Sequence, residues 1–153
     1  MSTIDVVVAV GAWIWANKDK LGLEWAELTY GVTNVKRWRN ETGEELEVWK
    51  LDGSQSRQDH YRIPAGQSDD ADMWIPWADN PEQYAVKHAV ILVGGRPLAY
   101  VWQSGTKIRF NTNDEFVPGG PSVPGAAKAG GNRTILVKTD EMGRLGFAIG
   151  GFQ

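Results

Sequence analysis

Aromatic and acidic side chains gather in residues 69–79, the segment of the chain best suited to bind a ligand. Two tryptophans lie on either side of Pro76, and aspartates precede them. An indole ring has a broad apolar face and one N–H donor, so it can stack on sugar rings, lipid head groups or quaternary amines. Because proline interrupts a regular strand, we expect a loop here, at the rim of the fold. The predicted ligand-binding residues are Trp74, Trp77, Asp70, Asp72 and, further along the chain, Tyr84.

The remaining tryptophans in strand-like segments are interpreted differently. A tryptophan on a strand is more often part of the core than of a binding surface. We therefore expect core positions for Trp13, Trp15, Trp49 and Trp102.

The acidic segment also raises the question of a metal. Asp69, Asp70, Asp72 and Asp79 supply the hard oxygen ligands that Ca²⁺ prefers. They lack the glycine-containing spacing of an EF-hand, and acidic loops are commonly just solvated. The chain has no cysteine, which excludes disulfides and thiolate metal sites. We predict no metal and no cofactor, and leave open whether the acidic loop of residues 69–72 binds calcium.

No motif for catalysis stands out, and we predict no catalytic residue. The two histidines, His60 and His88, have no nucleophile or metalloprotease motif around them, so we interpret both as structural. Glycoside hydrolysis needs only two carboxyl groups at the right separation and leaves no local signature. Glu24 with Glu27, or Asp70 with Asp72, keep a small carbohydrate-active enzyme as the alternative function.

The segment Lys36-Arg37-Trp38-Arg39 interleaves cations with an aromatic ring, as strands that contact phosphate do. In a regular strand Arg37 and Arg39 share one face and Lys36 lies on the other, so no single patch would hold all three charges. We expect a solvated edge strand. The net charge of −3 also argues against nucleic acid as a partner.

The elements that would position these residues are strands and turns. Segments 84–93, 98–103 and 107–110 alternate apolar and polar residues with turns between them, and a final hairpin is expected around residues 140–143. Apolar residues 4–15 are predicted as a buried strand with a bulge at Gly11, and residues 17–20 as a polar turn. Residues 117–131 hold many prolines and glycines and are predicted as a long surface loop. One short helical turn is expected after Asn80, with Pro81 at its first position.

A chain of 153 residues is about the length of one domain. Many short strands at regular spacing predict an all-β, single-domain antiparallel β-sandwich over residues 1–153, with a barrel as the alternative. Residues 4–15 are too short to span a bilayer and lack the basic start of a secretory signal. We expect a cytoplasmic protein, or one secreted without a classical signal peptide.

Two short segments carry a family resemblance. Gly31-Val32-Thr33-Asn34-Val35-Lys36-Arg37-Trp38 resembles a strand of the fungal fruit-body lectins. Residues 35–43, ending in Asn40-Glu41-Thr42-Gly43, resemble the opening strand of actinoporin-type cytolysins. The two families share one β-sandwich fold, and the resemblance covers about a dozen residues. It implies a compact sandwich that binds glycans or lipid head groups through aromatic loops, and no binding residue is carried over from it.

Together these features predict a non-enzymatic binding protein, a lectin or a component of a cytolysin-type toxin. Its expected partner is a glycan or a lipid head group, with a membrane surface as one place to meet it. The sequence leaves open which ligand is bound and whether copies of the chain form a homo-oligomer.

Overall fold

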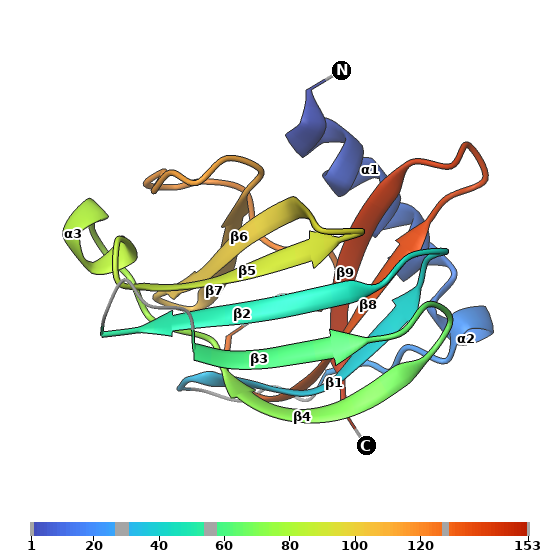
Figure 1. The fold of residues 1–153 in the computed structure, drawn as a ribbon, viewed down its shortest axis with the longest axis horizontal. Helices are drawn as coiled ribbons and strands as arrows, with labels where there is room; N and C mark the ends of the chain where they lie inside the picture. The colour runs from blue at the N-terminus through green and yellow to red at the C-terminus, as the bar shows by residue number, and fades with distance from the viewer. Residues whose placement is uncertain (1, 27–30, 54–57, 127–128, 153) are drawn as a thin grey trace.

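The fold consists of two β-sheets packed face to face, with one longer helix against the outside of one sheet (Figure 1). The computed structural model describes residues 2–26, 31–53, 58–126 and 129–152. In these residues one sheet has four strands in the order β4-β1-β8-β9, and the other has five in the order β3-β2-β5-β6-β7. The strands are β1 (Thr33–Glu41), β2 (Leu46–Asp52), β3 (Gln58–Ile63), β4 (Ser68–Trp74), β5 (Lys87–Val93), β6 (Arg96–Ser104), β7 (Lys107–Asn111), β8 (Gly131–Thr139) and β9 (Leu145–Gly151).

The core lies between the inner faces of the two sheets. Successive side chains of a strand point to opposite faces, so every second residue of each central strand is available for this layer. One cluster includes Val35 and Trp38 of β1, Met73 of β4, Ile91 of β5 and Phe147 of β9. The predicted all-β sandwich is confirmed, and the described strands do not close into a barrel. Strands β1 and β8 pair in parallel, whereas the other strand pairs of the described residues are antiparallel.

The amino-terminal prediction is wrong, because the apolar segment forms helix α1 (Thr3–Ala16) instead of a strand. Its buried residues include Val7, Val10 and Ile14, whose spacing follows one face of a helix. Ser2 caps the first turn, since its side chain accepts from the Asp5 N–H while the Asp5 carboxylate accepts from the Ser2 N–H. Valine and tryptophan favour strands locally, but here packing and the capping box decide the outcome.

Helix α1 packs across the outer face of β8 and β9 in the four-stranded sheet (Figure 1). Gly11 allows this close approach, because a Cβ atom there would lie 2.6 Å from the backbone oxygen of Phe147 in β9 and 2.3 Å from the Cβ of Pro124. Gly11 is thus a packing glycine of a helix and not the predicted strand bulge. A short helix, α2 (Lys18–Leu21), replaces the predicted polar turn that follows. None of the helices in the described part of the chain is long and apolar enough to cross a membrane.

The short helix predicted after Asn80 is present as α3 (Pro81–Tyr84). The Asn80 side chain accepts a hydrogen bond of 2.8 Å from the Gln83 N–H, and Pro81 starts the first turn. Helix α3 lies beyond one end of the five-stranded sheet, just before β5 begins (Figure 1). The long surface loop predicted over residues 117–131 is confirmed only in part. Residues 117–126 contain no named helix or strand, but Val123 and Ala129 are buried and Gly131 begins β8. Residues 127–128 lie outside the described part of the chain.

Candidate functional site

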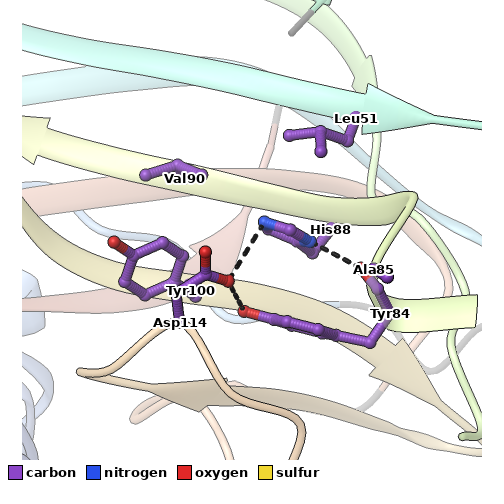
Figure 2. A pocket seen from close by; sticks show the side chains of 7 residues that line it. All are labelled: Leu51, Tyr84, Ala85, His88, Val90, Tyr100 and Asp114. Atoms are coloured by element: carbon purple, nitrogen blue, oxygen red, sulfur yellow. Dashed lines mark hydrogen bonds and ion pairs between the residues drawn. The ribbon is translucent and has the colours of Figure 1, made fainter. Parts of the chain in front are cut away.

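A hollow of about 460 Å³ opens on the outer face of the five-stranded sheet, away from the core (Figure 2). Strand β5 sends Ala89 and Ile91 inward to the core, so its alternate residues line the hollow from the other side. Pairing of β5 with its neighbours places residues of three strands on that face. The lining residues are Leu51, Tyr84, Ala85, His88, Val90, Tyr100 and Asp114.

Helix α3 and the segment that follows β7 provide one wall of the hollow. The Tyr84 ring at the end of α3 stacks on the His88 ring, with centroids 4.2 Å apart and planes at 10°. An edge of Tyr84 also meets Trp102, which is fully buried beneath it. Phe116 packs against both of these rings. This small second core fixes Tyr84 and the loop that carries Asp114.

Two polar side chains, Tyr84 and His88, converge on one carboxylate oxygen of Asp114 (Figure 2). The Tyr84 hydroxyl donates to Asp114 Oδ1 over 2.8 Å, and His88 Nε2 lies 3.7 Å from the same oxygen. His88 Nδ1 is 2.7 Å from the backbone carbonyl of Tyr84, which can only accept, so this nitrogen carries a proton. The Asp114 side chain is 61% exposed. No described residue hydrogen-bonds to its Oδ2, which therefore remains an acceptor for a ligand.

The Tyr84 hydroxyl stays protonated in this setting. Burial raises the pKa of Tyr84 far above its usual value, and the hydrogen bond to Asp114 together with the charge of that carboxylate raises it further. Tyr84 consequently acts as a hydrogen-bond donor that orients Asp114, and not as a base.

This arrangement predicts a loss of stability at alkaline pH. Because the folded pKa of Tyr84 lies above the unfolded value of about 10, its contribution to stability is complete below that pH and decreases as the pH rises further. Urea denaturation from about pH 8 to about pH 11 should show a steeper loss of unfolding free energy for the wild type than for Tyr84→Phe. Parallel curves for the two proteins would contradict the assignment.

The structure places the predicted ligand-binding residues in different regions. Trp74 is the last residue of β4, so the acidic segment before it is a strand and not the predicted loop. Trp74 and Trp77 are 48% and 37% exposed, which confirms that these indoles face water. The Trp77 Nε1–H donates to Asp79 Oδ2 over 2.7 Å, and an isolated bridge joins Trp77 to Gln103 of β6. Tyr84 lies in the hollow on the other sheet, so these residues do not form a single site.

Asp70 and Asp72 lie on the outer face of β4, and each forms an ion pair with a neighbouring cation. Asp70 contacts Arg37 at 3.0 Å, and Asp72 contacts Lys36 at 3.1 Å. A hydrogen bond from Asn34, followed by the contact with Lys36, holds the pKa of Asp72 below its usual value. Within the described ranges no group of three or more acidic or histidine side chains is arranged to hold a metal ion. In the other predicted carboxylate pair, Glu24 with Glu27, Glu27 lies outside the described residues.

The basic segment departs from its prediction in two ways. Strand β1 lies between β4 and β8, so it is a central strand and not an edge. A bulge between Val35 and Arg37 shifts its register, and Lys36 as well as Arg37 reaches the aspartates on the outer face of β4. Arg39, two residues beyond Arg37, lies on this face too. The bulge thus brings together three cations that regular alternation would separate.

The four tryptophans predicted as core divide between fully buried and partly buried positions, whereas Trp25, for which no position was predicted, is 64% exposed. Trp102 is fully buried as predicted. Trp49 is partly buried and stacks on His60, with ring centroids 3.7 Å apart. Trp13 and Trp15 are also only partly buried, and they belong to α1 and not to a strand.

Sequence reasoning missed His88, Tyr100 and Asp114 as candidate site residues. His88 was expected to be structural, and its 4% exposure and backbone hydrogen bond agree with that expectation, yet its ring also lines the hollow. The alternation of β5 and β6 contained a usable signal, because strand pairing sets Val90 opposite Tyr100. Asp114 lies in a loop, where no periodicity indicates which way a side chain points.

No protein-family model matches this chain, and neither a curated protein nor a solved structure does. The evidence for the candidate site therefore comes from the geometry of its residues alone.

Proposed function

We propose that this protein binds glycans, without altering them chemically, in the hollow formed by Tyr84, His88, Tyr100 and Asp114. The observation that carries this proposal is the Asp114 carboxylate, held on one oxygen by Tyr84 and open on the other. A fixed acceptor of this kind suits a sugar, whose hydroxyl groups need partners at set positions. Preorganisation also lowers the entropy lost on binding.

The rest of the hollow supports the same ligand class. Leu51 and Val90 provide an apolar floor, and the Tyr100 ring adds an aromatic surface. Sugar rings have apolar C–H faces as well as hydroxyl edges, so they suit a site with an apolar floor and few polar groups. The volume of about 460 Å³ falls within the roughly 300–1,000 Å³ of small-molecule sites. The stacked pair of Trp49 and His60 lies on the neighbouring strands β2 and β3 and extends the aromatic surface.

A lipid head group is the second candidate, and the neighbouring exposed indoles of Trp74 and Trp77 favour it. Tryptophan suits a membrane interface because its ring is apolar while its N–H remains hydrogen-bonded. Trp74 and Trp77 lie within four residues of each other, and both are accessible. The resemblance to lectins and actinoporin-type cytolysins supports either candidate equally.

A glycan array and a liposome flotation assay on the same preparation separate the two candidates. The glycan proposal predicts a saturable signal on a subset of the array sugars. It also predicts that the protein does not float with phosphatidylcholine or sphingomyelin vesicles. Flotation without array signal would replace the glycan proposal with lipid recognition. If neither assay gives a signal, both proposals fail.

Substitution of the exposed indoles tests the second candidate. Trp74→Ala or Trp77→Ala is expected to weaken vesicle binding about tenfold while the melting temperature changes little, because an exposed side chain adds little to core packing. Met142→Ala serves as the control, since Met142 is 76% exposed in the turn between β8 and β9. If both tryptophan variants unfold, these residues belong to the core and the membrane surface must be sought elsewhere.

A further inference from the structure

A second hollow, of about 270 Å³, opens on the outer face of the four-stranded sheet, beside the segment that follows α2. Helix α1 covers the β8 and β9 side of this face, whereas β1 and β4 contribute side chains to the hollow. Its lining residues are Gly22, Glu24, Arg37, Arg39, Ser68, Thr134 and Gly151. Two guanidinium groups thus share one small hollow on the face opposite to that of the glycan candidate.

Both guanidinium groups are held in place by carboxylates, and each keeps further donors. Arg37 Nε donates to Asp70 Oδ1 over 3.0 Å, and Arg39 Nη2 donates to Glu41 Oε1 over 2.7 Å. A guanidinium has five N–H donors, and these hydrogen bonds use one on each side chain. No other described residue accepts from either group, so the remaining donors are available to a ligand.

The surroundings strengthen these donors. The Arg39 side chain is 18% exposed, and that of Arg37 is 38% exposed. The Phe152 ring lies 4.9 Å from Arg37 Cζ and covers one side of the guanidinium. Partial removal from water makes a charge-assisted hydrogen bond stronger than one at the open surface.

The geometry points to a binding site for a phosphate or sulfate group between Arg37 and Arg39. Guanidinium groups match the oxygens of such tetrahedral anions, and the hydroxyls of Ser68 and Thr134 add neutral donors. Asp70 and Glu41 balance the charges of the two arginines, and Glu24 also lines the hollow, so the site offers guanidinium donors without an excess of positive charge. Such a site suits one compact oxyanion better than a polyanion. This site stands apart from the proposed glycan hollow, so either can fail without the other.

Titration of the full chain with inorganic phosphate at constant ionic strength tests the site. NMR of the arginine Nε–H groups should show saturable shifts for Arg37 and Arg39, and calorimetry should give the dissociation constant. Arg37→Gln and Arg39→Gln are each expected to weaken binding about tenfold or more, because each removes a charged donor. Arg62→Gln is the matched control, since Arg62 is exposed on β3 of the other sheet.

Two further measurements keep the test decisive. Ser68→Ala removes only an exposed hydroxyl, so it should fold normally and weaken phosphate binding, even if Arg39→Gln does not fold. Phosphatidylcholine vesicles with and without phosphatidic acid distinguish a lipid-borne phosphate from the free ion, and binding to either source supports the site. Absence of saturable shifts at Arg37 and Arg39, or equal affinity in Arg62→Gln and both arginine variants, would overturn the inference.

Discussion

Replacing Trp102 with alanine is expected to lower the free energy of unfolding by about 3–5 kcal/mol, as for other fully buried aromatic side chains. The ring has no exposed surface and packs with Tyr84 and Phe116 outside the main core. Its removal leaves a cavity beneath α3 and beneath the loop that carries Asp114. Glycan binding should therefore be lost together with stability.

Urea denaturation measures this change, and Trp77→Ala supplies the comparison. Trp77 is 37% exposed, so its loss should lower the unfolding free energy by about 1 kcal/mol or less. If Trp102→Ala costs no more than Trp77→Ala, the second core does not support the hollow.

Replacing Asp114 with asparagine is expected to weaken glycan binding about tenfold or more while the fold is retained. The variant keeps the size of the side chain and an oxygen that can accept from the Tyr84 hydroxyl. It removes the negative charge that strengthens hydrogen bonds to sugar hydroxyls. Calorimetric titration with the strongest array ligand measures the change in affinity.

Glu115→Gln is the matched control for this variant. Glu115 is the next residue of the same loop, is exposed, and does not line the hollow. Glu115→Gln removes one negative charge from the protein, as Asp114→Asn does, and should leave the glycan affinity unchanged. Equal weakening by both variants would show that net charge, and not the Asp114 contact, controls binding.

The five-stranded sheet was largely predictable from the sequence. The alternation over residues 87–110 and the turn residues between the segments match β5, β6 and β7. The predicted start of the first of these strands at residue 84 is wrong, because Tyr84 ends α3 and β5 begins at Lys87. Asn80 and Pro81 marked the start of α3 for a reason that is local, namely a side-chain cap and a fixed backbone angle. Such features predict local structure well because the residues that interact are close together in the sequence.

The amino-terminal helix was not predictable from the same rules. Its valines and tryptophans have the composition of a strand, and its helical face becomes recognisable only from what it buries. Leu136 of β8 and Ala148 of β9 receive that face. Both residues are more than 100 positions from α1 in the sequence, so a pattern within a short window of residues cannot predict these contacts.

The candidate sites depended on similar long-range contacts. The sequence predicts Tyr84 as a ligand-binding residue, but its partner Asp114 is 30 residues away in a loop. The clustering of Lys36, Arg37 and Arg39 required a bulge that strict alternation does not predict. Residue types therefore identified the chemistry available to the chain, and the fold decided which groups meet.

The most direct test of the glycan hollow is to locate the bound ligand. Isotope-labelled protein would be titrated with the strongest array ligand while backbone amide shifts are followed by NMR. We predict the largest shifts at Ala85, His88, Tyr100 and Asp114, which surround the hollow. Shifts confined to Trp74 and Trp77, or to Arg37 and Arg39, would contradict the assignment of glycan binding to this site.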